Sequence, residues 1–184
     1  MNNTSVIIIS AGKGTRMKSS ISKPLHKVGN LELVNHVINT AKKLNCQEIS
    51  VVVSKENCEE IRKNVDDSIK TVIQYDRLGT AHATSIGLSK IEHEENYVLI
   101  MYGDVPLIKA ETYENMLIKL KNSNASLAVL GFNVSDIKQK YGRLIVKNNE
   151  VILQAKKENL NRAIVTTLYD VVKFMVSKSL EKFT

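Results

Sequence analysis

Between residues 6 and 121, short uninterrupted runs of apolar residues alternate with stretches of helical spacing. Buried strands are predicted at the runs Val6–Ile9, Ile49–Val53, Thr71–Ile73 and Tyr97–Met101. Helices are predicted where apolar side chains recur every three or four positions, at Glu32–Leu44, Glu56–Asn64, Thr80–Lys90 and Glu111–Lys121. Strands that alternate with helices predict an α/β fold with a Rossmann-like, doubly wound, mostly parallel sheet, whose ligand crevice lies outside the carboxyl ends of the strands.

The pattern becomes strand-rich in the remainder of the chain. Leu127–Phe132 predicts a fifth strand, and the Asn148-Asn149 turn signal between two apolar runs predicts a hairpin over residues 144–153. Ile164–Val172 is strand-like, and Ser177–Phe183 predicts the start of a helix. With 184 residues and no internal linker or repeat, we expect a single domain over residues 1–184.

The formal charge of +7 comes from scattered lysines, without the aromatic-interleaved basic stripe that is typical of nucleic-acid binding; there is no Trp, and only 5% of residues are aromatic. Binding of small anionic substrates would explain the positive net charge equally well. No apolar run is long enough for a membrane span and the N-terminus has no signal-peptide pattern, so we expect a cytoplasmic location. Cys46 and Cys58 lack metal-site spacing and are predicted to be free thiols.

Candidate chemistry begins where the first predicted strand ends, in the loop Ser10–Arg16. Gly12 and Gly14 allow the backbone N–H groups to approach an anion closely, and Lys13 with Arg16 adds positive charge beside them. The loop matches neither the P-loop nor the GxGxxG fingerprint. Its glycines alone leave open an ordinary turn between strand and helix.

Two further segments carry polar candidates near predicted strand ends. Lys23 lies in a second basic segment, where Pro24 predicts extended chain at Lys23, and both basic segments are placed to face one pocket. Asp104 leaves the carboxyl end of a strand, directly after Gly103, which suits a magnesium ligand in a phosphate site. A turn-forming or helix-capping aspartate is the alternative.

Five motifs follow one another in order along the chain. They are Val6–Met17 (VIIISAGKGTRM), Ser22–Lys27, Gln74 with Leu78–Ala83 (LGTAHA), Tyr102–Leu107 (YGDVPL) and Tyr141–Arg143. In this combination the chain, from about Ser5 to Arg143, resembles the N-terminal uridylyltransferase (pyrophosphorylase) domain of the bacterial bifunctional GlmU family. The AGxGTRM element is shared by sugar nucleotidyltransferases generally, whereas LGTAHA and YGDVPL are similar to this family in particular.

The resemblance implies a nucleotidyltransferase of the nucleotide-diphospho-sugar type, which makes the cell wall precursor UDP-N-acetylglucosamine from UTP and N-acetylglucosamine 1-phosphate and releases pyrophosphate. It implies catalytic roles for Arg16 and Lys23 and a magnesium ligand in Asp104. The implied nucleotide-binding residues are Ala11, Gly12, Lys13, Gly14, Gln74, Gly79 and Thr80. The implied substrate-binding residues are Tyr102, Gly103, Gly142 and Gln154.

Departures from the family fall in the sugar-binding half. Gln154 replaces a family glutamate, and Val165-Thr166-Thr167 stands where the family has Asn-Thr-Gly. We expect a truncated domain that lacks the family's second magnesium ligand, an asparagine, and its hexapeptide-repeat acetyltransferase half, which excludes acetyl transfer. The open alternatives are a remnant or split product that binds nucleotide with little catalysis or needs a partner chain, a transferase for another sugar or base, and a basic nucleic-acid-binding protein.

Overall fold

The computed structural model describes residues 4–14, 17–92, 97–123, 127–133, 142–147, 150–155, 166–168 and 175–176. The chain divides into two compact units, one of residues 1–128 with 174–184 and one of residues 129–173. The expectation of a single domain over residues 1–184 stays a prediction.

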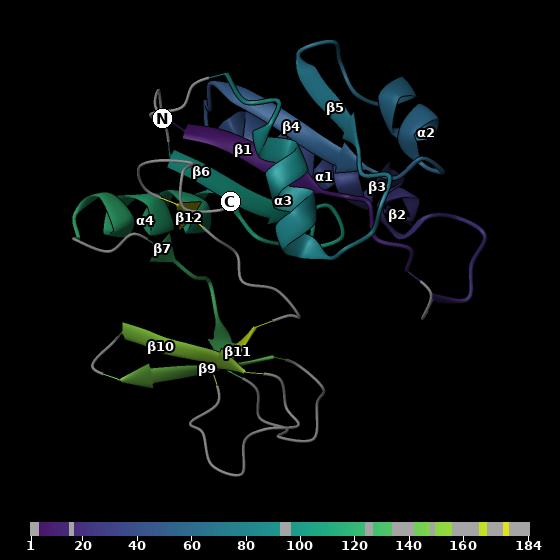
Figure 1. Cartoon of the computed structure of the whole chain (residues 1–184). Helices are drawn as coiled ribbons and strands as arrows, with labels where there is room; N and C mark the ends of the chain where they lie inside the picture. The colour runs from purple at the N-terminus through teal and green to yellow at the C-terminus, as the bar shows by residue number, and fades with distance from the viewer. Residues whose placement is uncertain are drawn as a thin grey trace. The chain divides into compact units, whose positions relative to one another are not determined.

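A six-stranded sheet with the order β5-β4-β1-β6-β12-β7 forms the centre of the first unit (Figure 1). Its parallel part consists of β1 (Thr4–Ile9), β4 (Glu48–Val53), β5 (Ile69–Ile73) and β6 (Tyr97–Tyr102). The short strand β12 (Met175–Val176) pairs antiparallel with β6, and β7 (Leu127–Ala128) pairs antiparallel with β12 at the edge of the sheet. The prediction of a doubly wound, mostly parallel sheet is confirmed, and so are the four predicted strands of its parallel part.

Helices cover both faces of this sheet. Among the described residues of the unit, the α-helices are α1 (Leu33–Lys43), α2 (Cys58–Lys63), α3 (Thr80–Leu88) and α4 (Ala110–Lys121). α1 connects β1 to β4 and α3 connects β5 to β6, in opposite directions across the sheet, so right-handed crossovers place them on opposite faces (Figure 1). Because both faces are covered, residues 6–9 of the central strand β1 form a continuous apolar run, in which Val6, Ile7 and Ile8 are fully buried.

The second unit contains a four-stranded antiparallel sheet with the order β10-β9-β11-β8. Its strands are β8 (Phe132–Asn133), β9 (Gly142–Lys147), β10 (Glu150–Ala155) and β11 (Thr166–Leu168). The pairing of β9 with β10 confirms the predicted hairpin.

Two predictions for the strand-rich part of the chain have different outcomes. The predicted strand Leu127–Phe132 is wrong as one element, because its two ends join different sheets as β7 and β8. A hydrophobic run predicts that its residues are buried, but it does not predict which sheet they join. The predicted helix Ser177–Phe183 lies outside the described residues.

The segment between β1 and α1 differs from the sequence prediction at Lys23. Leu25 N donates to Ser22 O at 2.9 Å and His26 N donates to Lys23 O at 3.2 Å, which closes a 3₁₀ turn over Lys23–Leu25. The predicted extended conformation of Lys23 is therefore wrong. Pro24 is tolerated because its missing N–H lies in the first turn, where it would have no partner. A small hairpin of β2 (Lys27–Val28) and β3 (Leu31–Glu32) follows and leads into α1.

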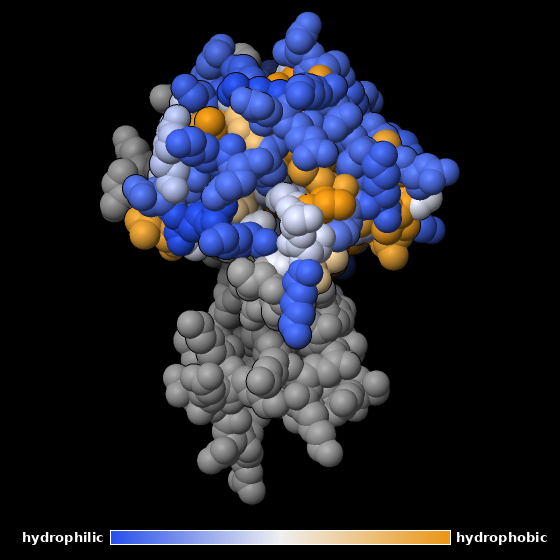
Figure 2. All heavy atoms as spheres, turned by 90° about the vertical axis from the view of Figure 1, so that its right-hand side faces the viewer, coloured by the Kyte–Doolittle hydropathy of each residue, from blue (hydrophilic) through white to orange (hydrophobic). Residues whose placement is uncertain are grey.

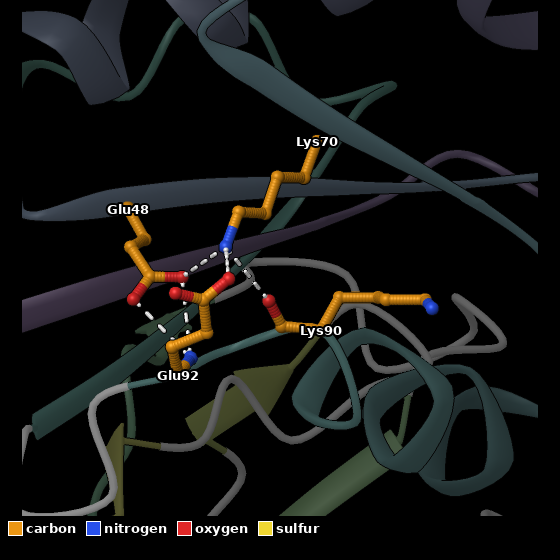
Figure 3. Close-up of polar contacts among 4 residues, drawn as sticks. All are labelled: Glu48, Lys70, Lys90 and Glu92. Atoms are coloured by element: carbon orange, nitrogen blue, oxygen red, sulfur yellow. Dashed lines mark hydrogen bonds and ion pairs between the residues drawn. The ribbon is translucent and has the colours of Figure 1, made fainter.

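An ion-pair network joins the amino ends of β4 and β5 to the residues after α3 (Figure 3). Lys70 Nζ lies 3.1 Å from Glu48 Oε2 and 2.7 Å from Glu92 Oε1, and the backbone N–H of Glu92 donates to Glu48. Hydrogen bonds to Glu92 and Glu48 raise the pKa of Lys70. The network lies at the amino ends of the strands. It therefore links β4, β5 and the segment after α3 without entering the crevice at the carboxyl ends.

Candidate active site

The point where the winding of the sheet reverses lies between β1 and β6. Chain connections leave this point in opposite directions, which in open α/β sheets opens a ligand crevice outside the carboxyl ends of the strands. Gly103 N donates to Ile9 O at 3.0 Å, and Ser10 N donates to Val52 O at 2.7 Å. The first bond brings the ends of β1 and β6 side by side, although about ninety residues separate them in the chain, and the second joins the end of β1 to β4.

A pocket of about 260 Å³ occupies this crevice. It is lined by Ile9, Ser10, Gly12, Gly14, Met17, Lys23, Pro24, Thr80, Tyr102 and Asp104. Six of these residues were predicted from the sequence, namely Gly12, Gly14, Lys23, Thr80, Tyr102 and Asp104. The fold therefore gathers residues from four separate motifs around one cavity.

The central polar contact of the pocket is the ion pair between Lys23 and Asp104. Lys23 Nζ lies 2.5 Å from Asp104 Oδ2, and the side chains are 27% and 24% exposed. The ammonium and the carboxylate therefore both reach the pocket and lose only part of their hydration. An anionic ligand would contact Lys23 here, and a hard cation would contact Asp104.

Gly14 brings the loop after β1 against the stem of Lys23. Its φ is +60°, and a Cβ built on it would lie only 2.7 Å from Lys23 Cβ. Gly12 has open space around its Cα, so close approach to the protein does not require a glycine there. Gly12 lines the cavity, where a ligand could approach its backbone.

Tyr102 and Gly103 end β6 at the inner wall of the pocket. Tyr102 is 8% exposed and its side chain is hydrogen-bonded to Thr80, and burial raises its pKa, so the phenol stays protonated at neutral pH. Gly103 is buried, and a Cβ on it would lie 2.1 Å from Ser10 Oγ. A glycine at this position lets the ends of β1 and β6 approach each other.

Gln74 follows β5 and is joined to the loop before α3. Its Nε2 donates to Gly79 O at 3.2 Å and lies 3.1 Å from His82 Nδ1. At 4% exposure, Gln74 is not the solvated strand-end residue that its position in the sequence alone would allow. The structure thus brings Gln74 and Gly79 together; neither lines the pocket, and their implied roles in nucleotide binding stay predictions.

The remaining predicted residues are distributed differently. Ala11 is buried in the hydrophobic core, and Lys13 is exposed and lines a second pocket of about 330 Å³ that also includes Glu56 and Arg77. Arg16 lies outside the described residues. Gly142 in β9 and Gln154 in β10 belong to the second unit, and their predicted roles stay predictions.

Several pocket residues escaped the sequence analysis, and Ser10 is the most informative. Its hydroxyl is buried and has no hydrogen-bond partner among the described residues, while the residue lines the pocket. Its position directly after a buried strand was a usable signal. Pro24 and Met17 also line the pocket. The pattern of apolar and polar residues along the chain does not show that the fold brings these two residues to it.

The face of the first unit toward which β4 runs is mainly hydrophilic, with apolar side chains in separate small patches (Figures 1 and 2). A polar face of this kind suits a small charged ligand better than an apolar docking partner. In the described part of the chain, no helix is long and apolar enough to cross a membrane.

Solved structures of other proteins share the architecture of this chain. A Bacillus anthracis protein provisionally assigned as a glucose-1-phosphate thymidylyltransferase, solved with sucrose, superposes with a TM-score of 0.73 at 17% identity, covering 95% of this chain and 71% of that chain. The fold is thus that of the Rossmann-like nucleotidyltransferases. Residues 6–164 match the MobA-like NTP transferase domain, and the chain belongs to this family.

Comparison with curated proteins shows which known nucleotidyltransferases the sequence of this chain resembles. The bifunctional protein GlmU of Marinobacter nauticus is 37% identical over 156 residues, which cover 84% of this chain and 33% of the relative. GlmU of Buchnera aphidicola is 39% identical over 154 residues, covering 83% of this chain and 34% of the relative. The chain thus spans about a third of the length of these relatives, and the resemblance to the GlmU family is confirmed.

Proposed function

We propose that this chain transfers a uridylyl group from UTP to N-acetylglucosamine 1-phosphate. In this reaction a phosphate oxygen of the sugar phosphate forms a bond to the α-phosphorus of UTP. The bond from that phosphorus to the bridging oxygen of the β-phosphate breaks, and pyrophosphate leaves. The observation that carries the proposal is the Lys23–Asp104 pair in a pocket beside the glycine loop, in a chain similar to GlmU proteins.

The residues of the pocket would act by positioning and charge neutralisation. Backbone N–H groups around Gly12 would approach the nucleotide phosphates, and the Lys23 ammonium would neutralise charge on the triphosphate as pyrophosphate leaves. Gln74 would offer its amide to the edge of the base, beside Gly79. Tyr102, held protonated by burial, would remain a hydrogen-bond donor at the wall of the pocket.

A magnesium ion fits this pocket only as a partner of the substrate. Within the described residues, no group of three His, Cys, Asp or Glu side chains could hold a metal ion. Asp104 is nevertheless a hard oxygen ligand at the pocket, and Mg²⁺ is commonly bound by one or two carboxylates together with substrate phosphates and water. When bound, Mg²⁺ would neutralise charge on the pyrophosphate.

The proposal is tested by incubating the protein with UTP, Mg²⁺ and N-acetylglucosamine 1-phosphate and measuring pyrophosphate. Asp104→Asn and Arg16→Ala are expected to lower kcat/KM by about a hundredfold or more, because Asp104 would hold Mg²⁺ and the resemblance implies that Arg16 neutralises charge on the triphosphate. Asp67→Asn removes an exposed carboxylate outside the pocket and should leave turnover unchanged. Absence of pyrophosphate from the unmodified chain would refute the proposal.

Nucleotide binding without turnover is a second candidate, favoured by the substitutions Gln154 and Val165 at positions implied in sugar binding. A thermal-shift screen across the four ribonucleoside triphosphates separates the candidates. A triphosphate at about one hundred times its Kd should stabilise the protein by about 2.7 kcal/mol. Stabilisation by UTP without pyrophosphate release supports binding alone, and preference for another triphosphate reassigns the base.

A further inference from the structure

We propose that Asn57 is a positioning residue that holds Lys23 and the loop after β1 in register for the triphosphate. This role deepens the proposed function and rests on it for the identity of the ligand. Asn57 lies outside every motif that carried the resemblance. It does not line the 260 Å³ pocket and is fully buried, so it acts through its neighbours.

The side chain of Asn57 joins three segments that are separate in the chain. Its Nδ2 donates to Ser10 O and to Ser22 Oγ, each at 2.9 Å. Its Oδ1 accepts a hydrogen bond from Ser54 N at 2.8 Å. One buried amide therefore links the end of β1, the residue before Lys23 and the loop after β4.

The orientation of this amide is fixed by its backbone partners. Ser54 N can only donate and Ser10 O can only accept, so the oxygen and nitrogen of Asn57 cannot exchange places without losing both bonds. The residue also occupies the N-cap of α2, yet it makes no side-chain capping bond. The amide bonds to the loops instead of capping its own helix, although capping is the usual role of asparagine at this position.

The contacts lead from Asn57 to the pocket in two short paths. Ser22 O accepts the hydrogen bond from Leu25 N that begins the 3₁₀ turn, and this turn presents Lys23 to Asp104. Ser10 begins the loop in which Gly14 packs against the stem of Lys23. Loss of the amide donor would release both paths at once, because Ser10 and Ser22 share the same Nδ2 group.

Asn57→Asp is the sharpest test, since it keeps the size and the acceptor for Ser54 N and removes the donor. Ser22→Ala removes one of the three hydrogen bonds and serves as a milder second variant if Asn57→Asp does not fold. Asn64→Ala is the matched control, because Asn64 lies at the other end of α2, is exposed and bonds locally to Glu60 O. Each variant is measured by hydrogen exchange without ligand and by steady-state kinetics.

We expect exchange in peptides containing Ser10 and Ser22 to rise by about tenfold in Asn57→Asp, with β6 and α4 unchanged. KM for UTP should also rise by about tenfold while KM for the sugar phosphate stays the same. Ser22→Ala should show the same pattern more weakly, and the double variant should resemble Asn57→Asp. Asn64→Ala should match the unmodified chain in every measurement.

Three results would overturn the role of Asn57. They are unchanged exchange at Ser10 and Ser22, a uniform rise across the whole first unit, and a local rise that leaves KM for UTP unchanged in an active protein. If the unmodified chain neither binds nor turns over UTP, the proposed function fails. The exchange measurement then still decides whether Asn57 positions the loop and Lys23.

Discussion

At the residue scale, the site depends on two kinds of contact around Lys23, the ion pair to Asp104 and the packing of Gly14 against its stem. The second contact can be isolated because the chain contains a nearly identical glycine elsewhere. Gly14 and Gly29 have φ values of +60° and +58°, but a Cβ on Gly29 would meet nothing within 4 Å. Their comparison separates backbone strain from the collision with Lys23.

We predict that Gly29→Ala destabilises the fold by about 1 kcal/mol, which is the usual cost of a left-handed conformation for alanine. Gly14→Ala carries the same cost and also forces Lys23 away from the loop. UTP affinity should therefore fall in Gly14→Ala and stay unchanged in Gly29→Ala, as measured by calorimetry. Equal affinities in the two variants would show that the contact between Gly14 and Lys23 does not matter for binding.

At the scale of elements, α3 packs closely on the sheet at Gly87. A Cβ on Gly87 would lie 2.6 Å from Ile7 Cγ2 and 3.0 Å from Val52 Cγ2. Ile7, Val52 and Ala83 belong to one buried apolar cluster with Ala11. The helix that supplies Thr80 to the pocket is thus seated on β1 and β4 through a residue without a side chain.

Gly87→Ala is expected to destabilise the protein by about 1–3 kcal/mol through overpacking. Helix propensity alone predicts the opposite sign, since alanine is favoured over glycine inside a helix by about 1 kcal/mol. The midpoint of urea unfolding decides between them. Ser85→Ala, at an exposed position of the same helix, should be close to neutral, and a stabilised Gly87→Ala would contradict the close packing.

At the scale of the whole molecule, scattered ion pairs connect elements that the sheet alone does not join. Asp66, in the turn before β5, pairs with Lys42 at the end of α1 and accepts hydrogen bonds from Ser68. The hydrogen bonds from Lys42 and Ser68 lower the pKa of Asp66 from 3.8 to about 2. The unfolded chain therefore binds a proton at this carboxyl at a higher pH than the folded chain does.

This pKa shift has a defined sign in stability. The contribution of Asp66 is fully present above about pH 4 and is lost as the pH falls toward about 2. The stability difference between the unmodified chain and Asp66→Asn should be present near neutral pH and shrink over that range in urea unfolding. Asp67→Asn controls for the loss of a nearby charge, and a pH-independent difference for Asp66→Asn would refute the ion-pair explanation.

Much of the fold was predictable because its signals are local. The β-branched run Val6–Ile9 has no polar break and had to be buried on both faces, and α4 had its apolar face at Tyr113, Met116, Leu117 and Leu120, all of which are buried. The split of Leu127–Phe132 between two sheets was not predictable, because pairing partners are chosen by distant segments. The 3₁₀ turn at Lys23 depended likewise on hydrogen bonds and packing.

For the candidate site, the sequence by itself determined the chemical groups: a glycine loop after one strand, a lysine and an aspartate, each in a recognisable motif. Only the tertiary structure decided that Lys23 pairs with Asp104 and that the buried amide of Asn57 joins Ser10 to Ser22. The physical reason is the distance along the chain over which each kind of interaction acts. Strand and turn preferences act between near neighbours in the chain, whereas hydrogen bonds between distant segments exist only after the sheet has brought the carboxyl ends of its strands together.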